Sequence, residues 1–466
     1  MKKLLLFIFT LSLCSNLFAQ DAKMRITVKV PNAEDEVYIV GNQKALGHWN
    51  PGAVKLEKTA EHERSIAVEV TYPVEFKFTK GSWASEGYTG DKFENPNIVI
   101  TEPTEQAAYE VLGWYDDNRR SFTEHYIRAN KGKYSFEVPE VQELMHIVMA
   151  LTPTGKADTN MVNHEGEYYQ KVMQTFKAFE SDPLVLQIEE RLSQNSYGDY
   201  ATLKMDACGF YFDGDKIEQD SVYDKLSWGG VNKIEPLVAE LERFAKASNF
   251  QNFYRSNQPY YSQLIQEMEA AIPIQKQWVW LEKNFDSKYD HYRITFSPLV
   301  NGSHSTNRFM QAGFNQTVMF IRGPITDPQY KKTVRNGLME LMVFTEIDHN
   351  YVNPLSDRYM DEIKTALPNL KAWATAEAIG YYPNEYAVFN EYMTWAVYSL
   401  YAKEKFKKKD FDAINDHIEK MMVERRGFVK YKEFNRELLA QYKKKGKGQG
   451  IEALYPSMLA WVRNHQ

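Results

Sequence analysis

Alternating polar and apolar residues over the first hundred positions predict a small β-sheet domain. Residues 24–30 run Met-Arg-Ile-Thr-Val-Lys-Val, and residues 65–70 and 74–78 repeat the same period of two. This period is typical of strands with one buried face. Short apolar runs at 37–40 and 98–100 add two more candidate strands. Several short strands at close spacing favour a β-sandwich.

The alternating pattern ends near residue 100, and a different period begins near residue 140. We assign the β-sandwich to residues 21–100 and a linker to residues 101–124, where Pro103 and an Asp-Asp-Asn run interrupt the rhythm. A chain of 466 residues is too long for one compact core. The rest of the chain, residues 125–466, is therefore expected to form a second domain.

Apolar residues in the second domain recur at helical spacing. Val141, Leu144, Met145 and Val148 lie on one face of a helix. Further helices are predicted at 168–179, 184–192, 234–281 and over most of the chain from 327, and strands at 203–213, 293–296 and 317–321. These elements predict a multidomain protein, a β-sandwich followed by an α-rich α+β domain.

The first residues have the pattern of a secretory signal peptide. Lys2 and Lys3 precede an apolar run from Leu4 to Leu13 that is too short to span a bilayer, and Ala19 provides a small residue for cleavage. We expect a signal peptide over residues 1–19 and a periplasmic or secreted protein. Lipidation of Cys14 is the weaker alternative, because a lipoprotein signal needs a small residue before the cysteine.

Charge and cysteine content exclude several classes of protein. The formal charge is −6 and becomes −8 when the two lysines of the signal peptide are removed, and no long basic run is present, which argues against nucleic-acid binding. Once Cys14 is removed, Cys208 has no partner for a disulfide. No later segment is an apolar run of membrane length, so no membrane span is expected.

Three short stretches of the first domain occur together in one known family. They are the strand into Gly41 followed by Leu46-Gly47-His48-Trp49-Asn50-Pro51, then Glu75-Phe76-Lys77-Phe78, then Pro96-Asn97. In this order they resemble the family-20 type of starch-binding module, an immunoglobulin-like β-sandwich. The resemblance implies a partner that is starch or a similar α-glucan.

The resemblance also implies the binding residues. An α-glucan presents apolar sugar faces ringed by hydroxyls, so its site needs an aromatic ring together with amides or ammonium groups. The family's residues of this kind correspond to Trp49, Lys77 and Asn97. A further family tryptophan is replaced here by Lys92, so that Trp83, Tyr88 or Phe93 would supply the second ring. Alternatively, Trp49 fills the edge of the sandwich and the domain is a spacer.

The second domain contains half of a zinc-binding motif. A zinc metallopeptidase helix carries His-Glu-x-x-His, in which both histidines bind the metal and the glutamate activates water. Here Glu346 and His349 are present, and Thr345 stands where the first histidine would be. In peptidases with a glutamate as third ligand, a later helix supplies it, and Glu391 is the candidate.

Residues 125–466 also resemble uncharacterised secreted bacterial domains thought to be metallopeptidase-like, with a glutamate-liganded zincin fold. The resemblance rests on Phe136-Glu137-Val138-Pro139-Glu140, on Ser297-Pro298-Leu299 with the Gly302-Ser303 loop, and on Glu346, His349 and Asn353-Pro354. A threonine hydroxyl is a poor zinc ligand. The resemblance therefore implies the fold, while zinc as a cofactor stays possible and no cofactor is certain.

Three interpretations of the second domain remain open. It is a non-catalytic relative of the peptidases, or an active enzyme in which His304 replaces the missing ligand and Glu346 is catalytic, or an ordinary helix whose Glu346 and His349 are unrelated. The leading hypothesis is an exported α-glucan-binding protein with a degenerate peptidase-like domain. The alternative is an active metal-dependent peptidase or hydrolase that the first domain holds on a glycan.

Overall fold

The chain folds into two compact units in the computed structural model. The structure describes residues 22–90, 95–115, 120–228, 231–325 and 329–466. Unit 1 comprises residues 1–119 with 229–231, and unit 2 comprises residues 120–228 with 232–466. The predicted signal peptide, residues 1–19, lies outside the described residues, as do Lys92 and Phe93.

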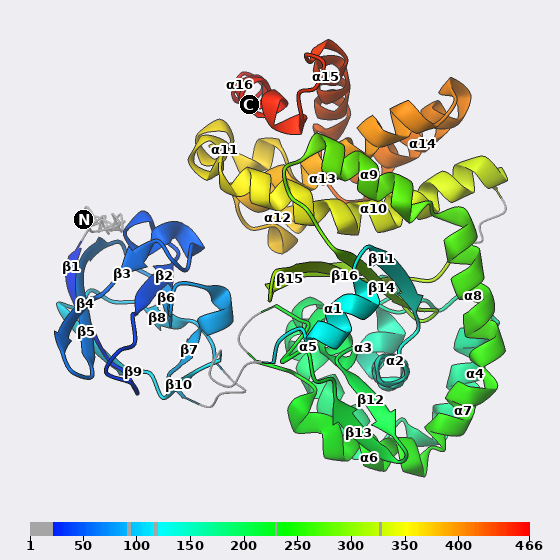
Figure 1. The fold of residues 1–466 in the computed structure, drawn as a ribbon, viewed down its shortest axis with the longest axis horizontal. Coiled ribbons are helices and arrows are strands. Elements are labelled where there is room, and N and C mark those ends of the chain that lie inside the picture. Colours follow the sequence, from blue (N-terminus) through cyan, green and yellow to red (C-terminus); the bar gives the residue numbers. More distant parts are fainter. Residues whose placement is uncertain (1–21, 91–94, 116–119, 229–230, 326–328) are drawn as a thin grey trace, which may run out of the picture. The chain divides into compact units, whose positions relative to one another are not determined.

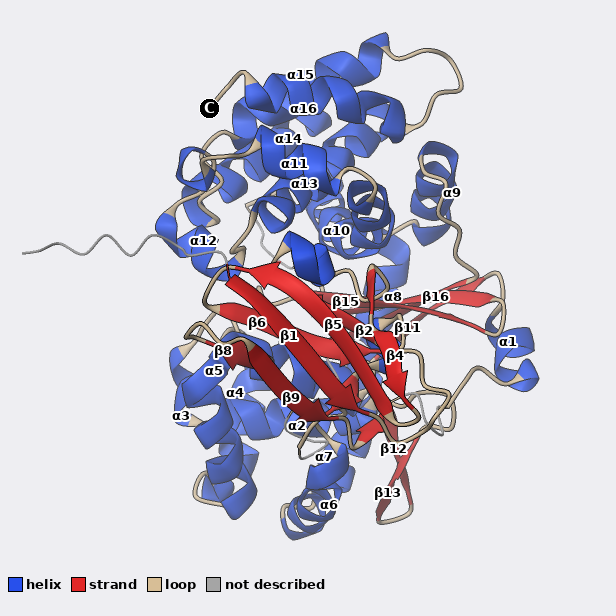
Figure 2. Ribbon diagram, turned by 90° about the vertical axis from the view of Figure 1, so that its left-hand side faces the viewer, coloured by secondary structure: helices blue, strands red, loops and turns tan. Residues whose placement is uncertain are grey.

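Unit 1 contains two four-stranded sheets and one short strand pair. Figure 2 looks onto the sheet with strand order β4-β5-β1-β9, behind which lies the sheet β3-β2-β6-β8. The strands of the first sheet are β1 (Ala22–Lys29), β4 (Glu57–Ala60), β5 (Glu63–Val70) and β9 (Gln106–Glu110). Those of the second are β2 (Tyr38–Gly41), β3 (Val54–Lys55), β6 (Val74–Thr79) and β8 (Ile98–Ile100). The short pair is β7 (Gly87–Tyr88) with β10 (Gly113–Trp114).

The alternation seen in the sequence produces the core of unit 1. On β1, Ile26 and Val28 are fully buried, and on β6 Val74 and Phe76 are fully buried too. Burying each such side chain stabilises the fold by roughly 1.5–3 kcal/mol relative to leaving it in water. The strand-rich first domain that the sequence predicts is therefore present.

The sandwich extends beyond residue 100, which differs from the predicted linker at 101–124. Strand β9 pairs in parallel with β1, and the buried Trp114 donates its indole N–H to Asp35 Oδ2 at 2.8 Å. The sequence of β9, Gln-Ala-Ala-Tyr-Glu, has no β-branched residue and is only half-buried, so its strand signal is weak. Unit 2 begins at Arg120, before helix α1 (Glu124–Asn130).

Unit 2 is built on a mixed sheet with strand order β11-β14-β16-β15. The first three strands are parallel, and the edge strand β15 is antiparallel to β16. Figure 1 shows helices α10 and α13 on one side of this sheet and α2 and α5 on the other. The strands are β11 (Lys133–Glu137), β14 (His291–Ser297), β15 (Ser305–Gln311) and β16 (Phe314–Arg322), which confirms the strands predicted at 293–296 and 317–321.

Helices make up most of the remainder of unit 2, as the sequence predicts. Those on the first half of the unit are α2 (Glu140–Leu151), α3 (Pro153–Ala157), α4 (Glu167–Phe176), α5 (Pro183–Ala207), α6 (Val238–Ala247), α7 (Phe250–Ser256), α8 (Gln258–Ala271) and α9 (Ile274–Asn284). The later ones are α10 (Lys332–Asp357), α11 (Met360–Ala366), α12 (Ala376–Tyr381), α13 (Glu385–Lys405), α14 (Lys408–Lys420), α15 (Tyr431–Lys444) and α16 (Tyr455–Arg463).

The strand predicted at 203–213 is wrong over its first half. Helix α5 continues to Ala207, and only β12 (Phe210–Asp213) is a strand, which pairs with β13 (Lys216–Gln219). The end of α5 is buried on nearly every side, so apolar residues appear at every second position without marking a strand. Period alone cannot separate a fully buried helix from a strand.

A buried carboxyl group lies in the core between α2, α4 and α8. Glu143 is fully buried and accepts a hydrogen bond of 2.6 Å from the Tyr168 hydroxyl, which lies 2.6 Å from that of Tyr261. Burial raises the pKa of Glu143 to about 7, although the bonds from Ser297 and Tyr168 favour its ionised form. The folded protein therefore keeps this group protonated well above the usual range for a glutamate.

The free energy of unfolding of wild type is expected to fall as the pH rises from about 4.5 to about 7, and Glu143→Gln is expected to lack this fall. In this window the unfolded chain ionises Glu143 while the folded protein retains the proton, so folding becomes less favourable by up to about 3 kcal/mol. Urea unfolding of both proteins across this range would measure the difference. Parallel stability curves would contradict the prediction.

Candidate functional site

The turn that presents Trp49 has an unusual backbone. In the short 3₁₀ segment Lys44–Trp49, the last three residues have positive φ angles, 78° for Gly47, 47° for His48 and 64° for Trp49. Only glycine adopts this region without steric cost, so the two larger residues are strained. Such strained backbone persists only where surrounding contacts fix it. Here the strained turn ends at Trp49, whose side chain is half-buried.

Trp49 stacks on Trp83, and we call these two rings the tryptophan pair. Their centroids are 6.3 Å apart and their planes are inclined by 29°, and Trp83 is 42% exposed. The Thr79 hydroxyl fixes both turns, because it donates to the Pro51 carbonyl at 2.7 Å and accepts from the Gly81 N–H at 3.1 Å. One fully buried side chain therefore sets the separation of the two rings.

Of the polar residues predicted for this site, Lys77 lies on the outer face of β6, and Asn97, just before β8, contacts that face. Lys77 Nζ contacts Glu86 Oε1 at 2.5 Å and donates to the Asn95 carbonyl at 2.6 Å. Asn97 donates its side-chain amide to Glu75 Oε1 at 2.7 Å. Because the side chains of a strand alternate, Glu75, Lys77 and Thr79 share one face, opposite the buried phenylalanines.

The structure thus brings Trp49 and Trp83 together, and it places Lys77 on the face of β6 whose Glu75 bonds Asn97. Of the alternatives for the second ring, Tyr88 packs against Tyr115 with centroids 5.4 Å apart. Sequence reasoning missed Thr79 and Glu86. The position of Thr79 could have been found, because it is the next outward-facing residue of β6 after Lys77.

The second candidate site lies in unit 2, where α10 faces α13. His349 Nε2 is 3.5 Å from Glu391 Oε1, so these two predicted residues do meet. The other oxygen of Glu391 is 2.6 Å from a guanidinium nitrogen of Arg426, which also donates to the Tyr382 hydroxyl. Arg426 follows a π-helical turn, Met421–Arg425. Sequence reasoning missed Arg426. We call the four residues of this site the charged cluster: Glu346, His349, Glu391 and Arg426.

The residues at this site do not fit a zinc ion. Thr345 is buried, and its hydroxyl donates to the Leu341 carbonyl of its own helix at 3.1 Å. The proposed replacement ligand, His304, bonds the Asn301 carbonyl through Nε2 at 3.0 Å. Among the described residues, no group of three or more His, Cys, Asp or Glu is placed to hold a metal ion. Two donors, one of them already paired with a guanidinium, are too few for zinc.

Two basic groups balance the two carboxylates of this site. Burial is the main cause that raises the pKa of Glu346. The nearby His349 acts to lower this pKa, and the nearby Glu391 acts to raise it. Lys204, on α5, is fully buried and donates to the Ser303 carbonyl. Burial lowers the pKa of Lys204 to about 7, whereas nearby Glu346 acts in the opposite direction. Arg426 and Lys204 therefore provide positive charge around Glu391 and Glu346.

Arg426→Met is expected to lower the free energy of unfolding by about 2 kcal/mol, because it leaves the Glu391 carboxylate buried without its charged partner. Adding Glu391→Gln should restore most of the loss. Arg358→Met is the matched control, since Arg358 is half-exposed in its ion pair with Glu452 and should cost less than about 1 kcal/mol. Denaturant unfolding measures all four proteins, and equal losses in the two single arginine variants would contradict the assignment.

Comparison with known families gives two matches. The model described as "Domain of unknown function (DUF4932)" matches residues 158–461, and the model described as "Starch binding domain" matches residues 23–111. No curated protein matches the chain. In the part of the chain that the structure describes, we find no helix with the length and apolar character needed to cross a membrane.

Proposed function

The chain belongs to the DUF4932 family of unknown function and carries a starch binding domain, and from these premises we propose that it is an exported α-glucan-binding protein. Unit 1 holds the protein on starch or a similar polysaccharide through the tryptophan pair. Unit 2 is a non-catalytic, peptidase-like domain. The signal-peptide pattern of residues 1–19 supports export to the periplasm or beyond the cell.

The tryptophan pair is the observation on which α-glucan binding rests. The two indole rings, whose centroids are 6.3 Å apart, provide apolar faces for neighbouring sugars. Trp83 is accessible to solvent. An α-1,4-linked chain curves, so its sugar rings do not lie in one plane, and aromatic planes inclined by 29° suit such a chain. Lys77, Glu75 and Asn97 supply the donors and acceptors that sugar hydroxyls require.

The charged cluster supports a non-catalytic unit 2. A zinc peptidase needs three protein ligands and a metal-bound water for its glutamate to deprotonate. Here the threonine hydroxyl bonds within α10, and Arg426 supplies the positive charge opposite Glu391. This donor set would therefore not activate a water for Glu346 to deprotonate.

Replacing both rings, as Trp49→Ala with Trp83→Ala, is expected to weaken retention of the full chain on insoluble starch by at least about tenfold, because the stacking faces are lost. A depletion assay with starch granules measures the bound fraction. Trp228→Ala is the matched control, since Trp228 in unit 2 is also 42% exposed and should leave retention unchanged. Equal retention by the double variant and wild type would overturn the assignment of the tryptophan pair.

A metal-content experiment tests the proposal for unit 2. After incubation with zinc and desalting, wild type and Thr345→His are expected to hold little zinc, because Arg426 remains paired with Glu391. Thr345→His with Arg426→Met frees Glu391 and should hold about one zinc per chain. Elemental analysis of protein with an unchanged circular dichroism spectrum gives the result. Near-stoichiometric zinc in wild type would contradict the proposal.

A further inference from the structure

Two tyrosines of unit 2 form an exposed aromatic pair that no core packing requires. Tyr197 is 42% exposed and Tyr381 is 56% exposed, and their ring centroids are 5.6 Å apart with planes inclined by 64°. Tyr197 follows a bend in α5 at Asn195, where φ is −147° and ψ is 67°, and Tyr381 is the last residue of α12. We call Tyr197 and Tyr381 the tyrosine pair.

The tyrosine pair lies beside the charged cluster. Tyr382, the residue that directly follows Tyr381, accepts a hydrogen bond at its hydroxyl from Arg426 of that cluster. The pKa of Tyr197 is raised to about 12, first by desolvation and then by the nearby carboxylates of Glu391 and Glu346, while Arg426 lowers it. Arg426 is 27% exposed and His349 is 19% exposed, so both are partly open to solvent. Hydrogen-bonding groups are therefore available next to two accessible aromatic rings.

This arrangement repeats the chemistry of unit 1 with different residues. In unit 1 an inclined tryptophan pair accompanies a cation and a buried carboxylate, Lys77 and Glu86, in contact. In unit 2 a tyrosine pair, edge-to-face where the tryptophan pair is stacked, accompanies a cation and a buried carboxylate, Arg426 and Glu391, in contact. In both units a carboxylate compensates the cation, so neither site offers an excess of positive charge that would select an anionic ligand.

We propose that the tyrosine pair and the charged cluster form a second α-glucan-binding site, on unit 2. The proposal takes its ligand class from the proposed function, because the chain already carries a starch binding domain. A neutral, hydroxyl-rich chain fits two inclined rings next to balanced donors and acceptors. A phosphate or another anion would be disfavoured by the carboxylates of Glu346 and Glu391.

The experiment compares four full-length proteins: wild type, Trp49→Ala/Trp83→Ala, Tyr197→Ala/Tyr381→Ala, and the variant with all four changes. Isothermal titration with maltoheptaose measures the affinity and stoichiometry of each. The tryptophan variant is expected to retain one weaker site, and the four-fold variant should bind at least about tenfold more weakly than that or not at all. The tyrosine variant should retain only the site of unit 1.

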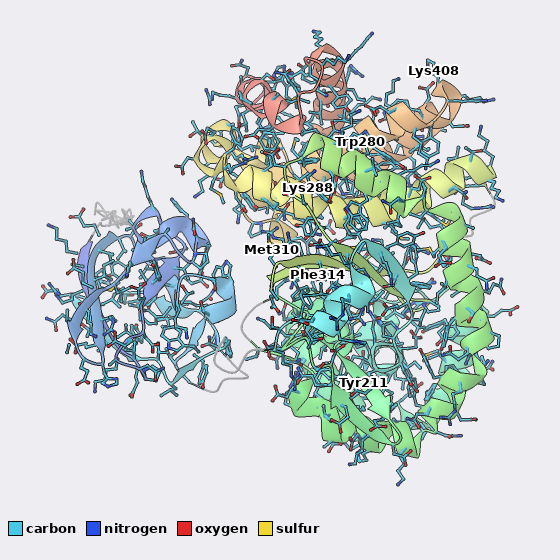
Figure 3. All side chains as sticks on the ribbon, in the orientation of Figure 1. Tyr211, Trp280, Lys288, Met310, Phe314 and Lys408 are labelled. Carbon is cyan, nitrogen blue, oxygen red and sulfur yellow. The ribbon has the colours of Figure 1, made fainter. Side chains whose placement is uncertain are left out.

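Controls separate a lost contact from a damaged fold. Tyr211 lies on the hairpin β12–β13 of unit 2 (Figure 3). It is 52% exposed, so Tyr211→Ala in the tryptophan variant should leave the residual affinity unchanged. Tyr197→Phe with Tyr381→Phe keeps both rings and should preserve binding. Circular dichroism and thermal unfolding check that each variant folds.

The outcomes distinguish the two proposals. The second site does not exist if the tryptophan variant binds no maltoheptaose, or if its residual binding survives loss of the tyrosine pair. Binding by unit 1 stands in either case. If the tryptophan variant binds as tightly as wild type and the tyrosine variant does not bind, the proposed function of unit 1 fails and the site on unit 2 stands. The assignment of an α-glucan as the ligand would be overturned by another result. In it, the tyrosine changes abolish binding of an unrelated peptide and leave maltoheptaose binding unaffected.

Discussion

The contact between helix α10 and the sheet is the constraint on which the site of unit 2 depends. Asn350 is buried, and its amide donates to the hydroxyls of Thr306 at 2.9 Å and Thr317 at 2.6 Å. These bonds fix the rotation of α10 about its axis. His349, the residue directly before Asn350, is consequently directed to Glu391 on α13, and Glu346 lies three residues before His349 on a neighbouring part of the same helix surface.

Fixing α10 in this way places two carboxylates in a poorly hydrated region, which must be compensated. Isolated buried charges are strongly unfavourable, and pairing with hydrogen bonds is the usual remedy. Lys204 comes from α5 and Arg426 from the segment after α14, so the compensation is assembled from two distant parts of the chain. A metal ion would neutralise the same carboxylates, and the guanidinium of Arg426 makes it unnecessary for the stability of this site.

The sequence predicted those features that local patterns encode. Period-two alternation identified β1, β5 and β6, and short apolar runs identified β2 and β8, whereas β3, β4, β7, β9 and β10 were not predicted. The turn around Trp49 pointed to one ring of the tryptophan pair. Helical spacing identified Glu346 and His349 as neighbours on α10. Arg426, Lys204 and Thr79 were missed, because their roles depend on contacts between segments far apart in the chain. The end of α5 was misassigned because burial on all sides removes helical periodicity.

The two aromatic pairs differ in how the chain positions them, and this bears on the affinity that each proposed site would have. The tryptophan pair is held by strained backbone at Trp49 and by the buried Thr79 hydroxyl, so its geometry exists before a ligand arrives. Preorganised rings lose little conformational entropy on binding, which favours tight attachment. The tyrosine pair lies just after a bend in one helix and at the end of another, and no strained turn like that at Trp49 is found at these described residues. A strong anchor in unit 1 and a weaker contact in unit 2 would together increase retention on a polymer, because each glucan chain offers many adjacent sites to both.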